Sequence, residues 1–175
     1  MPGAIPGGLS AATLSELDAQ LAGDDRPALV ALHHQPVPVS SPWIDRYPLL
    51  EPGALWAVLS RHAAVRAVCW GHIHHAFETE VDGIRALGCP STVSNSLPRA
   101  QRFTPDPAGP ACRWFELGPG GTLETGLLRV TADGGRDVVV EQHRDSPAGR
   151  IVNGHLNASR LGHRDRQRDA RIERV

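Results

Sequence analysis

The stretches ALVALHH (residues 28–34) and VRAVCWGHIHH (residues 65–75) decide the fold, because each joins a mainly apolar run to a cluster of histidines. Short apolar runs of this length are typical of buried strands. Histidines therefore follow the ends of two expected strands, where one loop region can bring them together. Imidazole nitrogens are ligands for borderline divalent metals. The pattern predicts a metal site at the strand ends.

The neighbouring segments predict an α/β arrangement. Ser10 can cap a helix over residues 11–22, whose leucines recur at helical spacing, and a second helix is expected over residues 54–62. The DG pair at 82–83 and the GPGG segment at 118–121 predict two β-hairpins. The order strand, helix, strand and then hairpins predicts an α/β sheet with antiparallel additions.

The segment QPVPVSSPWIDRYPLLEPG (residues 35–53) is expected to be a long loop. Its prolines exclude a helix interior and a central strand. Long ordered loops in compact domains usually have a function, so this loop is expected to overhang a site.

The chain has 175 residues, of which 41% are hydrophobic, and this predicts a globular domain over residues 1–143. Residues 144–175 contain eight Arg and four acidic residues but few large apolar ones. Such a segment buries too little area to offset its ordering entropy, so a disordered Arg-rich tail is expected. Binding of this tail to nucleic acid is the weakest of the functions considered.

Three cysteines, an odd number without the pair spacing of a zinc ribbon, argue against a disulfide framework and for a reducing compartment. Cys69 lies within an expected strand and is predicted to be a small buried apolar group. The sequence has no signal segment and no apolar run of the roughly 18 residues that a membrane span needs. A cytoplasmic protein without membrane contact is expected.

The spacing of the histidines in GHIHH (residues 71–75) predicts the directions of their side chains. In an extended segment, residues two apart face the same side, so His72 and His74 can point into one pocket while Ile73 packs the other way. Gly71 lacks a side chain where the backbone must bend or approach an ion.

The motifs LHHQPVP and GHIHH, separated by a Pro-rich loop, a helix and a strand, resemble the last two motifs of calcineurin-like metallophosphoesterases. The subgroup they resemble most is the class III 3′,5′-cyclic nucleotide phosphodiesterases. The resemblance covers roughly residues 5–130 and includes the flanking segments PGGLS, SSPWID, DGIRALGCPST, WFEL and GTLET.

The resemblance implies the C-terminal half of a metallophosphoesterase αββα sandwich, in which loops at the sheet ends hold a dinuclear metal centre. His33 and His72 would bind one metal and His74 would complete the other. His34 could be the ligand instead of His33, and His34 and His75 are candidates for contact with substrate. The ions implied are two divalent metals, Fe or Mn, with Zn as an alternative.

The activity implied is that of a 3′,5′-cyclic AMP phosphodiesterase, a hydrolase in which a metal-bound hydroxide attacks a phosphodiester. The substrate would be a cyclic nucleotide or another phosphodiester. The resemblance leaves the catalytic residues unassigned.

The sequence departs from the family because its earlier Asp-x-His, Gly-Asp-x-x-Asp and Gly-Asn-His-Asp motifs are absent. We therefore expect a C-terminal fragment, from a truncated gene, a misassigned start or a split gene, that is inactive alone. Three imidazoles can still bind one Zn-like ion. A non-catalytic metal- or partner-binding remnant is the alternative. Half a sandwich would expose a sheet surface, which predicts self-association.

Overall fold

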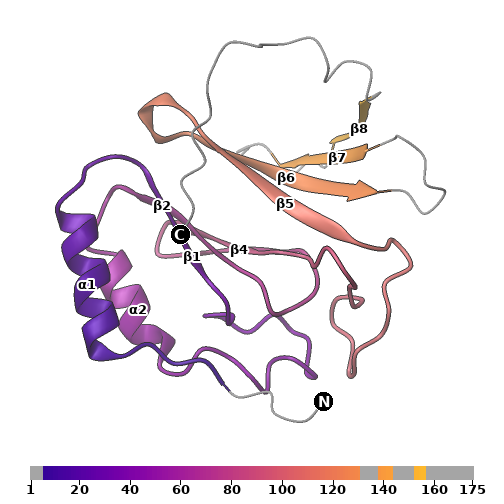
Figure 1. Ribbon diagram of the computed structural model, residues 1–175, viewed down its shortest axis with the longest axis horizontal. Coiled ribbons are helices and arrows are strands. Elements are labelled where there is room, and N and C mark those ends of the chain that lie inside the picture. The colour runs from indigo at the N-terminus through magenta and orange to yellow at the C-terminus, as the bar shows by residue number, and fades with distance from the viewer. Residues whose placement is uncertain (1–5, 131–137, 144–151, 157–175) are drawn as a thin grey trace.

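The computed structural model describes residues 6–130, 138–143 and 152–156, which form two α-helices and two four-stranded sheets (Figure 1). The first sheet has the strand order β1-β2-β4-β3 and the second the order β5-β6-β7-β8. The helices are α1 (Ala11–Ala22) and α2 (Pro52–Leu59), and the strands of the first sheet are β1 (Ala28–Leu32), β2 (Val65–Trp70), β3 (Phe77–Val81) and β4 (Ile84–Gly88). The second sheet contains β5 (Ala111–Leu117), β6 (Leu123–Val130), β7 (Val138–His143) and β8 (Val152–Leu156), and the short 3₁₀ turn η1 (Pro119–Gly121) joins β5 to β6.

The first sheet is mixed. Strands β1 and β4 both pair with β2 in parallel, and β3 pairs with β4 in the antiparallel sense. Asp82 and Gly83 connect β3 to β4 with φ of 50° and 80°. Two positive φ angles match the twist of the hairpin strands, so the predicted turn at this pair is confirmed.

The two helices lie on one face of the first sheet. The Ser10 side chain caps α1 by accepting a hydrogen bond from the Thr13 amide at 3.1 Å, as the sequence predicts. Helix α2 begins at Pro52, two residues earlier than predicted, because proline suits the first turn of a helix. The helix ends at Leu59, before the predicted end at residue 62. The Arg61 amide then donates a hydrogen bond to the Val58 carbonyl oxygen, which closes a turn tighter than that of an α-helix.

The core lies on both sides of the first sheet, because successive residues of β2 point to opposite faces. Val68 and Trp70 pack with the helices, whereas Ala67 and Cys69 face the second sheet and pack near Leu123. In Figure 1 the first sheet lies between the helices and the second sheet. The expected α/β sandwich of two sheets is confirmed, and so is the burial of Cys69.

A buried arginine ties the two sheets together. From β5, Arg113 donates hydrogen bonds to the carbonyl oxygens of Gly88 at 3.2 Å and Phe77 at 3.4 Å. Its side chain is 1% exposed, and Glu78 lies 4.0 Å away. A buried guanidinium is stable only where acceptors replace its hydration, so these bonds fix the second sheet against the end of the first.

The second sheet is antiparallel throughout. The predicted turn at residues 118–121 is confirmed, because η1 joins β5 to β6 and Gly120 and Gly121 have φ of 74° and 82°. Strand β8 lies beyond the expected boundary at residue 143 and pairs with β7. The disordered tail expected over residues 144–175 stays a prediction, and apart from residues 152–156 it lies outside the described residues. No helix in the described ranges is long and apolar enough to cross a bilayer.

Candidate metal centre

Three imidazoles meet where β1 and β2 end. Leu32 and Trp70 are register partners in the parallel pair, so the residues that follow them emerge at the same edge of the sheet. One ring nitrogen from each of His33, His34 and His72 lies within 4.8 Å of the other two. The sequence prediction that the strand ends bring these two histidine motifs together is confirmed.

The spacing within this histidine trio, His33, His34 and His72, suits a metal ion. Nδ1 of His72 lies 3.2 Å from Nε2 of His33. Two nitrogen ligands at tetrahedral angles on a zinc ion, with Zn–N distances near 2.0–2.1 Å, lie about 3.3 Å apart. The ring centroids of His34 and His72 are 4.2 Å apart. The arrangement therefore fits a single divalent ion.

The ring of His34 is held from two sides. Its Nδ1 lies 2.9 Å from the carbonyl oxygen of Tyr47, which can only accept, so Nδ1 carries the proton and Nε2 is free to act as a ligand. Gly7 lies against the ring, where a Cβ would come within 2.7 Å of Cγ. Backbone hydrogen bonds from Gly7 to Pro48 and from Leu50 to Gly7 keep this glycine in place.

Burial favours the neutral, metal-binding form of His33 and His72. Burial, together with the neighbouring charges of His34 and His33, lowers the pKa of His72 to about 4. Burial also lowers the pKa of His33. Nε2 of His72 is buried without a hydrogen-bond partner in the described part of the chain. Because Nδ1 is the nitrogen that faces His33, an ion shared by those two nitrogens does not satisfy this Nε2.

The backbone of the GHIHH segment differs from the expectation. His72 and His74 have φ of 63° and 56°, in the left-handed region that non-glycine residues rarely adopt. The segment is therefore not extended, and the prediction that residues two apart share one face is wrong. Ile73 is fully buried in the core, as predicted. A Cβ on Gly71 would make only ordinary contact with His33, at 3.8 Å, so the bend does not depend on this glycine.

His74 lies outside the trio. Its Nδ1 donates to the carbonyl oxygen of Ser94 at 2.7 Å, since a carbonyl can only accept. Its ring packs near Trp43, with centroids 6.5 Å apart, and near Phe103, at 6.1 Å. Ligation of a metal by His74 stays a prediction.

His75 does not take the place expected for it. It is 3% exposed, and its Nδ1 lies 2.8 Å from the carbonyl oxygen of Ile73. Burial lowers its pKa, which favours the neutral ring. This burial contradicts the expectation that His75 faces solvent, and contact of His75 with substrate stays a prediction.

The proline-rich loop is ordered and lies beside the trio, as the sequence predicts. The Asp45 carboxylate accepts hydrogen bonds from the amides of Val39 at 2.9 Å and Ser41 at 3.0 Å. The loop carries Trp43, which also packs edge-on against Phe103 with centroids 5.4 Å apart. These two aromatic side chains form a wall next to His74 that the sequence does not reveal, because Phe103 is brought there only by folding.

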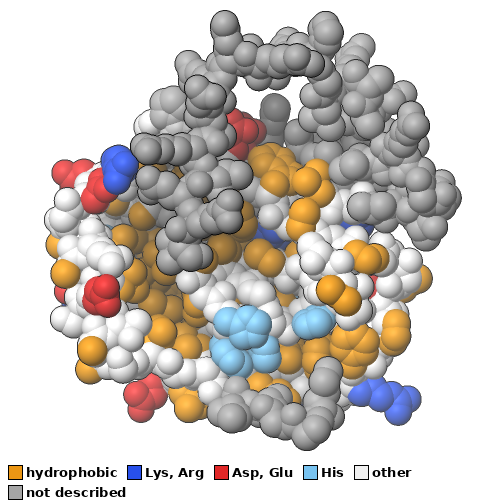
Figure 2. Space-filling view, in the orientation of Figure 1, with side chains coloured by type: hydrophobic (Ala, Val, Ile, Leu, Met, Phe, Trp, Pro, Cys, Tyr) orange, Lys and Arg blue, Asp and Glu red, His pale blue; other side chains and the backbone are white. Residues whose placement is uncertain are grey.

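Figure 2 shows a cluster of histidine side chains on the face of the molecule that it presents. Within the ranges that the structure describes, no carboxylate joins the trio at ligand distance. Three imidazoles leave one tetrahedral position open on a single ion. A pair of metals would need further ligands, and bridging carboxylates are the usual ones.

Proteins of known activity are similar to this chain. The 3′,5′-cyclic adenosine monophosphate phosphodiesterase of Pseudomonas aeruginosa is 38% identical over 147 residues, which cover 83% of this chain and 52% of the relative. A 3′,5′-cyclic-nucleotide phosphodiesterase of Nostoc is 38% identical over 127 residues, covering 72% of this chain and 48% of the relative. The 3′,5′-cyclic adenosine monophosphate phosphodiesterase of Escherichia coli is 36% identical over 125 residues, which cover 71% of this chain and 46% of the relative. The chain thus spans about half the length of these relatives.

Other comparisons add less. No protein-family profile matches the chain. A dimetal phosphatase from Danio rerio aligns with 78% of this chain and 36% of its own, with a TM-score of 0.45 and 18% identity, and this likeness supports no conclusion about the site. The sequence relatives carry more weight: over about half of its relatives' length the chain is similar to proteins named as 3′,5′-cyclic nucleotide phosphodiesterases, in agreement with the family that its histidine motifs resemble.

Proposed function

We propose that this chain supplies the histidine ligands of a metal-dependent 3′,5′-cyclic nucleotide phosphodiesterase whose substrate is cyclic AMP. The observation that carries the proposal is the convergence of His33, His34 and His72 at the ends of two parallel strands. The activity named for the relatives supports the choice of substrate.

The residues of the trio have separate tasks in this proposal. His33 and His72 hold a divalent ion through nitrogens that already lie 3.2 Å apart. His34 completes the ligand set, and its hydrogen bond to Tyr47 fixes the ring tautomer. When bound, the ion supplies Lewis-acid stabilisation of phosphoryl charge. Fe and Mn are the ions we expect, with Zn as the alternative, and His74 is the candidate ligand for a second ion.

Hydrolysis requires groups that this chain does not contain. The sequence lacks the three earlier family motifs, and within the described residues the metal ligands are imidazoles only. Two-metal hydrolysis needs ligands that place both ions on one phosphoryl group. We therefore propose that the chain binds metal alone but hydrolyses cyclic AMP only with the rest of the domain.

Residues 1–143 form the main part of the phosphodiesterase portion in this proposal, and the second sheet continues through β8. A cytoplasmic location is also part of the proposal. It is supported by the three cysteines, which are all free thiols and therefore suit a reducing compartment.

The test combines metal titration with an assay of cyclic AMP hydrolysis in Mn or Fe. We expect one ion per chain and no turnover by the chain alone. Turnover by the isolated chain at the roughly 1 s⁻¹ or more that is usual for enzymes would show that no further groups are needed. Failure to bind any divalent ion would refute the metal site. Metal binding without turnover under every condition, including after addition of the rest of the domain, would favour a non-catalytic remnant.

A further inference from the structure

Two cysteines lie on the face of the first sheet that is turned toward the second sheet. Cys69 of β2 is buried, and its register partner in β4 is Leu87. The amide of Cys89, two residues after Leu87, donates to the carbonyl oxygen of Trp70 at 2.7 Å and so extends the ladder between the two strands. Residues two apart in a strand share a face. Cys69 and Cys89 are therefore diagonal neighbours on one face of the sheet.

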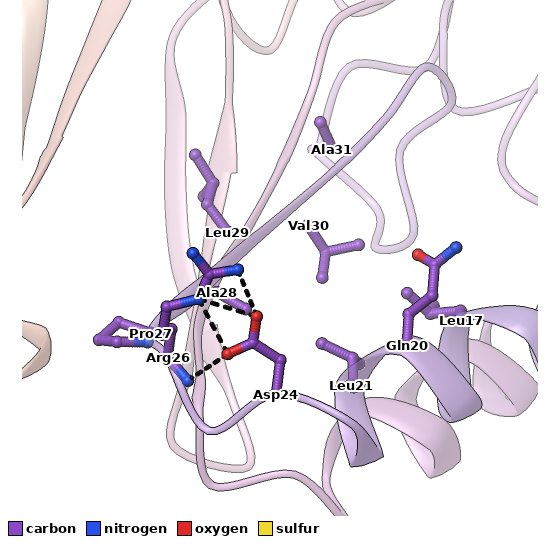
Figure 3. A pocket seen from close by; sticks show the side chains of 10 residues that line it. All are labelled: Leu17, Gln20, Leu21, Asp24, Arg26, Pro27, Ala28, Leu29, Val30 and Ala31. Atoms are coloured by element: carbon purple, nitrogen blue, oxygen red, sulfur yellow. Dashed lines mark hydrogen bonds and ion pairs between the residues drawn. The ribbon is translucent and has the colours of Figure 1, made fainter.

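The packing around the two sulfurs agrees with this register. Cys69 belongs to a buried cluster between the sheets, and Cys89 packs against the same cluster. Leu29 of β1 also packs there: in Figure 3, Val30 points toward helix α1, whereas Leu29 points away from this helix. Within the cluster the thiols of Cys69 and Cys89 are hydrogen-bonded to each other. The two sulfurs are thus neighbours in an enclosed, largely apolar space.

A buried cation lies beside this thiol pair, Cys69 and Cys89. Nε of Arg113 donates to the carbonyl oxygen of Gly88, the residue before Cys89, at 3.2 Å. The Arg113 side chain is 1% exposed, and its charged neighbours are Glu78, at 4.0 Å, and Arg85. A nearby positive charge favours the ionised form of an acidic group. Arg113 therefore favours the thiolate over the thiol at its side.

The two thiols differ in reactivity. The hydrogen bond from Cys69, together with Arg113, lowers the pKa of Cys89 against the opposing effect of burial. The same hydrogen bond and burial raise the pKa of Cys69. Cys89 is also half-buried, whereas Cys69 is buried. Because the thiolate is the nucleophile, Cys89 reacts first and Cys69 stands beside it as the second thiol.

We propose that Cys69 and Cys89 form an oxidation-sensitive pair that hydrogen peroxide converts to a disulfide. The Cys89 thiolate attacks one peroxide oxygen, the O–O bond breaks, and the released hydroxide takes up a proton, which gives a sulfenic acid and one water. The Cys69 sulfur then attacks the Cys89 sulfur. The S–O bond breaks, and hydroxide leaves with the Cys69 proton as a second water. The two sulfurs lose two electrons to the peroxide, and a dithiol reductant returns them.

The disulfide requires a small movement at a strand end. Diagonal neighbours in a sheet have Cα atoms about 7–8 Å apart, whereas a disulfide usually spans about 4.4–6.8 Å. Cys89 lies just beyond Gly88, the last residue of β4, so the movement is confined to this end. In a reducing compartment the pair rests as two thiols, and disulfides formed there are usually transient and redox-sensing. The proposal does not depend on metal binding at the trio.

The test treats the full chain, folded and reduced, with hydrogen peroxide near neutral pH. Remaining thiols are then alkylated in urea, and the chain is cleaved after arginine, which separates the three cysteines into residues 67–85, 86–99 and 103–113. We expect mass spectrometry to find 67–85 linked to 86–99 in the monomer. The Cys89 thiol should disappear at least about tenfold faster than that of Cys112, which is also half-buried, because more of Cys89 is thiolate.

Three variants separate the roles of the thiols. Cys69→Ser should abolish the linked peptide and leave a sulfenic acid at Cys89 that a 1,3-diketone traps. Cys89→Ser should abolish both products. Cys112→Ser is the matched control, since Cys112 lies next to Arg113 in β5 but on the opposite face, and it should leave the yield of the linked peptide unchanged. Circular dichroism checks that each variant folds, and Cys69→Ala replaces Cys69→Ser if the latter does not.

Four results would overturn the proposal. They are the absence of the linked peptide after Cys89 has been oxidised, equal rates of loss of the Cys89 and Cys112 thiols, a disulfide between two copies of the chain, and pairing of Cys112 in comparable yield. The chain unfolded in urea is the reference, because its cysteines pair without guidance from the fold. The same distribution of disulfides in the folded and unfolded chains would also refute a pair selected by the structure.

Discussion

Nδ1 of His72 lies 3.2 Å from Nε2 of His33, although the two residues are 39 positions apart in the sequence. Parallel pairing of β1 with β2 brings them together, and the left-handed backbone at His72 aims its ring across the strand ends. The nitrogens are thus placed for a common ion before any ion binds. Preorganised ligands lose little conformational freedom on binding, which favours affinity.

The first prediction concerns the ligand set. We expect His33→Ala, His34→Ala and His72→Ala each to weaken Zn or Mn binding by more than about 100-fold. Loss of a residue that only hydrogen-bonds to a metal ligand already lowers metal affinity by about 10- to 100-fold, and loss of a ligand itself should lower it more. His74→Ala should change the affinity for the first ion by less than about threefold, since His74 lies outside the trio. Isothermal titration measures both effects. A strong loss of metal affinity in His74→Ala with no loss in His34→Ala would instead support His33, His72 and His74 as the ligands, as the sequence suggests.

A pair of glycines tests how His34 is positioned. Gly7→Ala should force the His34 ring to move, because the new Cβ would lie within 2.7 Å of Cγ, and we expect a loss of about 1–3 kcal/mol in unfolding free energy together with weaker metal binding. Gly8→Ala is the matched control, since nothing lies within 4 Å of its Cβ position. Urea unfolding and metal titration measure the two effects. Equal behaviour of the two variants would show that Gly7 does not position the ring.

The metal-free protein should lose stability as the pH falls below about 6.5. Burial lowers the folded-state pKa of His33, His72 and His75 below the ordinary value of 6.5, to about 4 for His72. The unfolded chain therefore binds more protons than the folded one between these pKa values and pH 6.5, so the free energy of unfolding decreases as the pH falls through that window. Urea unfolding in a chelator across this pH range measures the effect. His75→Gln should flatten the dependence, and a wild-type stability independent of pH there would contradict it.

The fourth prediction concerns the contact between the sheets. Arg113→Leu removes the donors to Gly88 and Phe77, and we expect unfolding free energy to fall by about 2–4 kcal/mol because buried carbonyl oxygens lose their partners. Arg102→Ala, at an exposed position, should change stability by no more than about 0.5 kcal/mol. Thermal and urea denaturation report both values. A neutral Arg113→Leu variant would mean that apolar packing can replace these hydrogen bonds.

Much of the fold is predictable because its signals are local. Ser10 caps its helix, and the turn residues at 82–83 and 118–121 require positive φ angles that glycine and aspartate tolerate. The apolar runs of β1 and β2 mark the strands. The bounds of α2 were predicted less well, because Pro52 moves its start and tight turns end it early.

The site is less predictable, because its geometry depends on contacts between distant segments. The pattern around His72 and His74 suggests an extended strand end, yet both residues adopt the left-handed conformation. Packing of Ile73 into the core stabilises this bend and carries His75 inward with it. Backbone strain of this kind costs about 1–3 kcal/mol and persists only where the surrounding structure supports it. The contacts that support this strained backbone come from distant segments, so the local sequence pattern does not predict them.

The sequence by itself determined that two apolar strands end in histidines, that hairpins follow, and that the chain resembles a phosphodiesterase without its earlier motifs. The tertiary structure decided that His34 joins His33 and His72 while His74 and His75 turn away. The physical reason is the range of the interactions: periodicity and turn chemistry act within a few residues, whereas ring orientation and strand neighbours depend on packing across the whole domain.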